Sequence, residues 1–373
     1  MTTLTAVLRD EIRQTGPVTL ARYMELALHH PTLGYYRNRD PLGAAGDFTT
    51  APEISQMFGE MIGAWLAVVW QQMGSPATVR LAELGPGRGT LMSDALRATR
   101  ALPGFHHAID LHLVETSEPL RAAQAAAAAK AGITATWHER IEDLPPGPLL
   151  LVANEFLDAL PIRQFEQTAQ GWRERLVTVP DSDGDQFRFV LSNDTAPLEP
   201  PAFLRDAPSG TVWETSPASH AMIQTVANRI AADGGAALFI DYGYAQQSTG
   251  ESLQALRAHR PHDPLDAPGT ADITAHVDFA ALARDAVAAG ALVYGPLDQG
   301  PFLLGLGMET RAERLRAASL AANRPDQASA VATAFKRLIA PTEMGSLFKA
   351  LALTGPHQPA PPGFTAAPQA EMS

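Results

Sequence analysis

The chain of 373 residues contains no cysteine, which excludes disulfide bonds and thiolate metal sites and agrees with a reducing compartment. It also lacks any uninterrupted apolar run of the ~20 residues that a membrane-spanning helix needs, so we expect no membrane span. Basic residues are fewer than acidic ones, 28 against 40, and the formal net charge is −12. Because phosphate contacts need clustered Lys and Arg, this balance argues against nucleic acid as a partner.

Signatures of several other protein classes are also missing. The short apolar start of the chain meets Arg9, Asp10 and Glu11 at once, unlike a secretory signal, and a cytoplasmic protein is therefore expected. The sequence has no Gly-x-Ser-x-Gly elbow and no Walker lysine. No spacing of His, Asp and Glu resembles a metal site, and we expect no bound metal.

What the sequence does contain is typical of a globular protein with a large core. Its hydrophobic content is 46% and its mean hydropathy is −0.06. The length exceeds one small domain, so a principal domain with additions is expected. We predict an N-terminal helical extension (residues 1–74), a main domain (75–350) with an inserted antiparallel β lobe at about 164–215, and a flexible Pro- and Ala-rich tail (354–373).

From residue 78 onward, apolar strand patterns alternate with helical ones. Strands are predicted at residues 79–84, 109–115, 134–138, 149–154, 236–241 and 292–295. Helices are predicted at residues 52–70, 219–232, 279–289, 310–323 and 327–339, the first of them with Thr50 as a candidate N-cap. Such alternation predicts an α/β fold with a mostly parallel sheet, and ligands on these sheets bind beyond the carboxyl ends of the strands.

The strand at residues 79–84 runs into glycines at every second position, Gly85, Gly87 and Gly89, and a helix follows. Glycine lets the backbone turn sharply and lets a ligand approach closely. Glu83 stands just before this turn, where its carboxylate would repel a pyrophosphate but suit a cation, such as the sulfonium and amino group of S-adenosylmethionine (SAM). These four residues predict a nucleotide-type cofactor site. A tight strand–helix turn without a ligand is the alternative.

Residues at the ends of the next two strands extend the predicted cofactor site. Glu115 ends the second strand, where an acid can accept hydrogen bonds from ribose hydroxyls. At the end of the third strand, Trp137 is a candidate to pack on an adenine face, and His138 or Glu139 a candidate to contact its edge. The alternatives are an exposed strand-end carboxylate at Glu115 and a core position for Trp137.

The fourth strand ends in Asn154-Glu155-Phe156-Leu157-Asp158, which places an amide and two acids at the ligand edge of the sheet. Burying such groups unpaired costs several kcal/mol, so a ligand is a natural partner for them. We predict that Asn154 binds the cofactor and that Glu155 and Asp158 are catalytic. The alternative is that both acids cap a helix beginning near Phe156.

Three other residues are weaker candidates for the chemistry. Asp47 lies in a loop, residues 46–53, that joins glycine freedom, hydroxyls and carboxylates. Asp241 ends a later strand and so points to the same edge of the sheet. The third candidate is His276. The alternative for Asp241 is a paired acid, and the alternative for His276 is a structural residue at a helix start.

Two segments together resemble the MidA family of SAM-dependent methyltransferases, relatives of the mitochondrial complex I assembly factor that methylates arginine. They are residues 46–60 (GDFTTAPEISQMFGE) and 83–90 (ELGPGRGT). Further matches follow in order at residues 154–161, 241–243, 272–279 and 299–303, so the resemblance covers roughly residues 5–350. It implies a class I, Rossmann-like methyltransferase fold with an N-terminal helical extension, and SAM bound at the glycine motif.

The resemblance further implies arginine omega-N-methyltransferase activity on a protein substrate such as a respiratory complex I subunit. A guanidinium, with a pKa of about 12 or above, is a poor nucleophile while its charge is delocalised. Carboxylates that grip it in bidentate fashion orient it, and methyl transfer depends on such alignment. We hypothesise that Glu155 does this, with Asp158 or Asp47 as a second carboxylate. The alternatives are a small-molecule methyltransferase and a SAM-binding assembly or scaffold protein without turnover.

Overall fold

The computed structural model describes residues 3–37, 49–179 and 186–364, and the chain divides into two compact units. The first, here called the sheet unit, consists of Thr49–Leu157, Met222–Gln246 and Phe279–Ser373. The second, here called the accessory unit, consists of Met1–Phe48, Asp158–Ala221 and Gln247–Asp278. The catalytic candidate Asp47 lies outside the described residues, as do residues 365–373 of the predicted tail.

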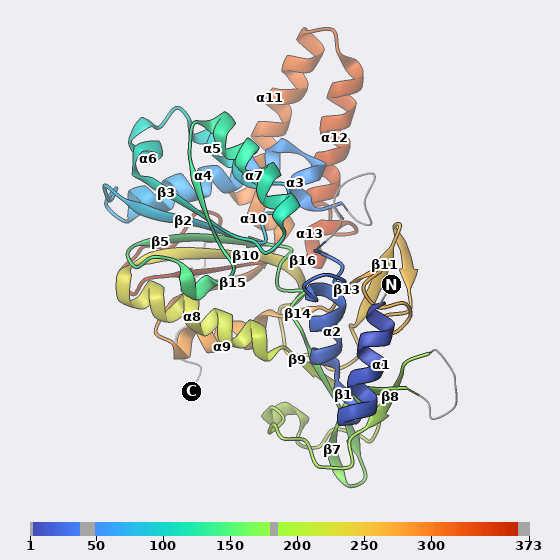
Figure 1. Ribbon diagram of the computed structural model, residues 1–373. Coiled ribbons are helices and arrows are strands. Elements are labelled where there is room, and N and C mark those ends of the chain that lie inside the picture. Colours follow the sequence, from blue (N-terminus) through green and yellow to red (C-terminus); the bar gives the residue numbers. More distant parts are fainter. Residues whose placement is uncertain (1–2, 38–48, 180–185, 365–373) are drawn as a thin grey trace. The chain divides into compact units, whose positions relative to one another are not determined.

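The sheet unit is built on a mixed sheet with the strand order β15-β16-β10-β5-β2-β3-β4 (Figure 1). Its strands are β2 (Val79–Leu84), β3 (Ile109–Val114), β4 (Ala135–His138), β5 (Leu149–Asn154), β10 (Gly235–Tyr244), β15 (Leu292–Asp298) and β16 (Phe348–Thr354). Neighbours from β10 to β4 are parallel, which confirms the predicted α/β fold. The strand order reverses between β2 and β5, so the carboxyl ends of these two strands are the expected ligand position.

Helices cover both faces of this sheet, with α4, α5 and α7 on one face and α8 and α9 on the other (Figure 1). Their bounds are α3 (Ala51–Ile54), α4 (Gln56–Gln72), α5 (Thr90–Thr99), α6 (Pro103–Ala108), α7 (Glu118–Ala131), α8 (Pro217–Asp233) and α9 (Phe279–Ala288). Every residue of β5 is buried, as expected for a continuous apolar run between two helical layers. The core on the first face joins α4 and α5 to apolar side chains of β2, β3 and β5.

The predicted helix over residues 52–70 is in fact two helices, so the prediction of one continuous helix is wrong. Ser55 has extended backbone (φ −162°, ψ 139°) between α3 and α4, and its hydroxyl accepts a hydrogen bond from Met57 N at 3.2 Å. Ser55 therefore caps α4, whereas Thr50 makes no side-chain cap. Helix α4 packs into the core, and its Phe58 and Trp65 have no exposed surface.

The strand β16 has no counterpart among the predicted strands. Its sequence is mostly Ala and Leu, and such a short apolar run does not distinguish strand from helix. β16 runs antiparallel to both β10 and β15, and all of its residues are buried. The C-terminal helices are α10 (Gln299–Gly305), α11 (Met308–Ala321), α12 (Pro325–Ile339) and α13 (Met344–Leu347). Among the described residues, no helix has the length and apolar character to cross a membrane.

The accessory unit has two small sheets, in the orders β1-β7-β6-β9, with β8 beside β7, and β12-β11-β13. Its elements are α1 (Leu4–Thr15), β1 (Val18–Thr19), α2 (Leu20–His29), β6 (Arg163–Thr168), β7 (Gly171–Thr178), β8 (Arg188–Leu191), β9 (Val212–Thr215), β11 (Gln254–Arg257), β12 (Arg260–His262), β13 (Asp272–Thr274) and β14 (Val277–Asp278). The antiparallel pairing of β6, β7 and β8 confirms the predicted inserted β structure. Helices α1 and α2 pack on it around Leu8 and Tyr23.

Candidate functional site

The glycine turn between β2 and α5 depends on backbone that other residues avoid. Gly85 has φ +60°, and a Cβ added there would lie 2.7 Å from the ring of Phe156. Gly89 is the N-cap of α5 with φ +79°, and its added Cβ would lie 3.3 Å from the Cα of Gln124. L-residues rarely adopt this left-handed backbone. The turn is therefore fixed by close packing on two other segments of the sheet unit.

Two buried acceptors lie beside this turn without a hydrogen-bond donor in the described part of the chain. They are Glu83 Oε2 at the end of β2 and Asn154 Oδ1 at the end of β5. Glu83 pairs with Val152 across the two parallel strands, so Asn154, two residues farther on, lies on the same face as Glu83. Burial raises the pKa of Glu83 from 4.5 to about 8. Two orphaned acceptors at the switch point of the sheet are suited to a ligand that donates hydrogen bonds, above all a cation.

The carboxylate of Glu115 is already largely hydrogen-bonded. Its Oε1 accepts from the backbone N–H groups of Thr116 (2.8 Å) and Ser117 (2.7 Å), and its Oε2 accepts from Gln124 Nε2 (3.1 Å). Burial raises the pKa of Glu115, and these hydrogen bonds oppose the effect. A carboxylate offers about four lone-pair sites, so Glu115 has room for one further donor, such as a single hydroxyl.

Gln124, on helix α7, is a further candidate site residue that the sequence patterns do not predict. Its amide donates to Gly87 O at 2.7 Å and to Glu115, and it accepts from Trp137 Nε1 at 2.8 Å. The signal in the sequence is a single amide in an alanine-rich helix, at a position that is buried together with Leu120 and Ala128. Trp137 is half-buried against the core on the same sheet face as Glu83.

His138 and Trp137, both predicted adenine contacts, lie on opposite faces of the sheet, because successive strand residues alternate. The ring of His138 is hydrogen-bonded to His112 on β3, Nε2 to Nδ1 at 2.9 Å. Burial lowers the pKa of His138, and the neighbouring imidazole lowers it further. The structure therefore brings Trp137, and not the ring of His138, to the face that carries Glu83.

Glu155 has a backbone conformation that is rare for a residue with a side chain, with φ +51°. Its Oε1 accepts hydrogen bonds from the backbone N–H of Ala51 at 2.7 Å and from Asn154 Nδ2 at 3.0 Å. The segment after Glu155 is a turn, and no helix begins at Phe156. The alternative interpretation of Glu155 as a helix cap is therefore excluded.

Asp241, on β10, holds the turn that carries Glu155. Its Oδ2 accepts from the backbone N–H groups of Phe156 (3.1 Å) and Leu157 (2.8 Å), and its Oδ1 accepts from Tyr242 N (2.9 Å). With 1% of its surface exposed, Asp241 lies beneath the turn rather than at the surface. This geometry favours the paired-acid interpretation of Asp241 over a direct part in chemistry.

Helix α3 links the glycine turn to the turn after β5. Ala51 N donates to Glu155, as described above, and Glu53 Oε1 accepts from the hydroxyl of Thr90 at 2.5 Å. Glu53 also forms an ion pair with Arg88 of the glycine turn at 3.6 Å. Three segments that the sequence singles out separately thus meet in one place within the sheet unit.

Asp158 and His276 belong to the accessory unit. The carbonyl oxygen of Asp158 accepts from Ala275 N at 3.0 Å, and His276 N donates to the hydroxyl of Ser252 at 2.9 Å. Burial lowers the pKa of His276, against the opposing charge of Glu214. The hydrogen bond from the backbone of His276 to Ser252 favours a structural role for His276. A catalytic role for Asp158 stays a prediction.

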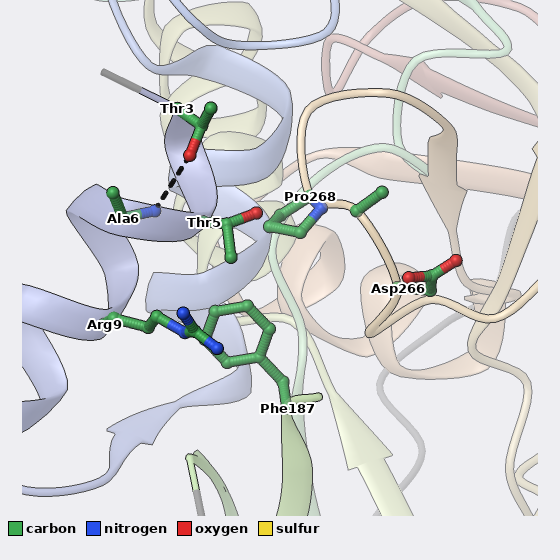
Figure 2. Close-up of a pocket in the computed structure, with 8 residues that line it drawn as sticks. Thr3, Thr5, Ala6, Arg9, Phe187, Asp266 and Pro268 are labelled. Atoms are coloured by element: carbon green, nitrogen blue, oxygen red, sulfur yellow. Dashed lines mark hydrogen bonds between the residues drawn. The ribbon is translucent and has the colours of Figure 1, made fainter. Parts of the chain in front are cut away.

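The accessory unit also has a pocket of about 370 Å³, drawn in Figure 2, and the residues that line it are Thr3, Thr5, Ala6, Arg9, Phe187, Asp266, Ala267 and Pro268. Thr3 caps helix α1 there, since its hydroxyl accepts from Ala6 N at 3.3 Å (Figure 2). None of the candidate site residues is among those that line this pocket. Within the described ranges, no three His, Asp or Glu side chains are grouped so as to hold a metal ion.

Known proteins resemble this chain over most of its length. A family model described as S-adenosyl-L-methionine-dependent methyltransferase matches residues 61–297. The chain is 39% identical to the mitochondrial protein arginine methyltransferase NDUFAF7 homolog of Drosophila melanogaster, over 93% of this chain and 83% of that one. It is 38% identical to human mitochondrial protein arginine methyltransferase NDUFAF7, over 93% and 82% of the two chains.

A solved structure of the same architecture was bound to a product of SAM chemistry. It is a protein from Burkholderia thailandensis in complex with S-adenosyl-homocysteine, 32% identical, with a TM-score of 0.85 over 98% of this chain and 95% of that one. The expectation of a cytoplasmic protein is contradicted by the curated relatives, which are named as mitochondrial proteins.

Proposed function

We propose that this chain, which belongs to the family of S-adenosyl-L-methionine-dependent methyltransferases, methylates an arginine side chain of a protein substrate. The names of the relatives from fly and human support an arginine as the acceptor. The first substrate to test is a subunit of respiratory complex I, which the sequence motifs suggest. Glu155 is the residue to which we assign the grip on the guanidinium.

The residues at the carboxyl ends of β2, β3 and β5 fit SAM as the cofactor. Glu83 Oε2 and Asn154 Oδ1 are buried acceptors that lack donors within the described residues, and an ammonium group would satisfy both. Glu115 has room for one ribose hydroxyl, and Trp137 offers an apolar ring on the same face as Glu83. When bound, SAM supplies a methyl group from a sulfonium that is ready for displacement.

One observation carries the assignment of Glu155. Its backbone is left-handed, and its carboxylate is held by hydrogen bonds from two other residues. Strained backbone of this kind costs of order 1–3 kcal/mol and persists where the surroundings enforce it, often at functional sites. Here Asp241 fixes the turn, while Ala51 and Asn154 fix the carboxylate. A carboxylate held in this way is preorganised to orient a cationic side chain without reorganising during the reaction.

The role assigned to Glu155 is orientation of the guanidinium and stabilisation of the cationic product. A guanidinium keeps its charge at neutral pH, and a carboxylate hydrogen-bonded to its N–H groups restricts its rotation. A second carboxylate would complete the grip, and Asp158 and Asp47 remain our candidates for it. Substitution of either by Asn, with turnover measured at saturating SAM, tests each assignment separately.

The proposed function is tested by the methylation state of arginine in a strain that lacks this protein. Mass spectrometry of its proteins should find an omega-N-methylarginine mark lost in the deletion strain and restored by the wild-type gene. A titration of the purified protein with SAM accompanies this experiment. SAM binding with every arginine mark retained in the deletion strain would overturn a protein arginine as the acceptor. No SAM binding would favour a scaffold protein.

A further inference from the structure

Helix α7 carries one buried amide in a sequence that is otherwise largely alanine. Both polar atoms of this amide have hydrogen-bond partners. Gln124 has 1% of its surface exposed. Its Nε2 donates both of its hydrogens, to Gly87 O at 2.7 Å and to Glu115 Oε2 at 3.1 Å. Its Oε1 accepts from the indole N–H of Trp137 at 2.8 Å. A buried polar side chain is retained at low cost only when its partners are complete, as they are here.

The three partners of Gln124 come from three different parts of the cofactor site. Gly87 lies in the turn after β2, Glu115 follows β3, and Trp137 is on β4. The helix also approaches the turn closely, since a Cβ on Gly89 would lie 3.3 Å from Gln124 Cα and 3.4 Å from Ala127 Cβ. One side chain thus sets the spacing between the turn, the acid and the aromatic ring.

We propose that Gln124 is a positioning residue for SAM, whose amide holds the glycine turn, Glu115 and Trp137 in the arrangement that the cofactor binds. The proposal rests on SAM binding by this site and is independent of which acceptor is methylated. Only an amide of this length offers two donors and one acceptor together. A carboxylate would face the carbonyl of Gly87 and the carboxylate of Glu115 with no hydrogen to donate.

Two substitutions separate positioning from a general effect on folding. Gln124→Met preserves approximate volume but loses all three hydrogen bonds, so SAM should bind at least about ten-fold more weakly at every pH, the loss that corresponds to a hydrogen bond to a charged group. Relative to wild type at the same pH, Gln124→Glu should bind SAM as weakly as Gln124→Met at pH 8 and recover in part near pH 5.5, because a protonated carboxyl regains one donor. Gln327→Glu, at an exposed position of α12, is the matched control and should bind as wild type.

The experiment is calorimetric titration of the full chain with SAM and with S-adenosyl-homocysteine at several pH values, on variants whose folding circular dichroism confirms. The Michaelis constant for SAM should rise while that for the acceptor stays unchanged. Wild-type affinity in Gln124→Met would overturn the proposal, as would a loss in Gln124→Glu that does not depend on pH. If Gln124→Glu fails to fold, Gln124→Met decides the question alone. A wild-type protein that binds SAM but methylates no arginine would overturn the proposed acceptor and leave this inference intact.

Discussion

The carboxylate of Glu155 accepts a hydrogen bond from the backbone N–H of Ala51 at 2.7 Å, although 104 positions separate the two residues in the sequence. This bond joins the turn after β5 to the start of helix α3. The same helix reaches the glycine turn through Glu53 and Thr90. Helix α3 therefore joins the proposed acceptor side of the site to the proposed cofactor side.

Substitution of Gly85 by Ala should abolish SAM binding. The added Cβ would lie 2.7 Å from Phe156, and the backbone at φ +60° is strained for alanine. Gly132→Ala is the matched control, because Gly132 has φ +75° but nothing within 4 Å of an added Cβ. It should cost about 1–2 kcal/mol of stability for the backbone alone and leave SAM affinity unchanged. Equal SAM affinity of the two variants would contradict our interpretation of the turn.

Binding of SAM should release close to one proton per molecule at neutral pH. With a pKa of about 8, Glu83 is mostly protonated in the free protein, and a bound cation favours its ionised form. Affinity for SAM should therefore increase as the pH rises to about 8. Titration calorimetry in buffers of different ionisation enthalpy measures the proton directly. Glu83→Gln should release none, and an unchanged proton count in that variant would assign the proton to another group.

The free protein should lose stability as the pH rises, and Glu83 should be one cause. Its pKa is higher in the folded protein than the ordinary value of 4.5, so the native state holds the proton more tightly. The contribution of Glu83 is most favourable below pH 4.5 and is lost progressively up to about pH 8, where the buried carboxyl ionises. The Tm of Glu83→Gln should therefore exceed that of the wild type at pH 9, with a smaller difference at pH 5. The reverse order would contradict the assignment.

Asp241→Asn should weaken methyl transfer while SAM still binds. Three backbone N–H groups depend on the two oxygens of Asp241, and an amide has only one acceptor for them. We expect a loss of about 1–3 kcal/mol in the free energy of unfolding, the cost of unsatisfied buried donors. Denaturant unfolding measures that loss, and kcat at saturating SAM measures the effect on the turn. An unchanged kcat would remove Asp241 from the support of Glu155.

Much of this architecture could be predicted from sequence because local patterns record it. The strands β5 and β10 contain continuous apolar runs, which burial between two helical layers accounts for, and polar residues follow these runs at Asn154 and Asp241. The strand β16 could not be predicted, because its alanines and leucines become a strand only through pairing with β10 and β15. Tertiary pairing there outweighs local propensity.

The candidate site was predictable in part for the same reason. Glu83, Glu115 and Glu155 stand at strand ends, where topology alone brings them to one edge of the sheet. Gln124 could not be found in this way, because its value lies in three partners that are distant in sequence. Trp137 and His138 are neighbours on one strand, so their side chains point to opposite faces of the sheet. Which of the two lies on the face of Glu83 depends on the register of the strand, and the sequence alone does not give that register.

The most direct test of the account is the Glu155→Gln variant in a strain that lacks the wild-type gene. Its purified protein should bind SAM with wild-type affinity by calorimetry, while mass spectrometry finds no omega-N-methylarginine restored in the complemented strain. Glu313→Gln, at an exposed position of α11, should restore the mark fully. Full restoration of the mark by Glu155→Gln would contradict the central claim that this carboxylate orients the arginine for methyl transfer.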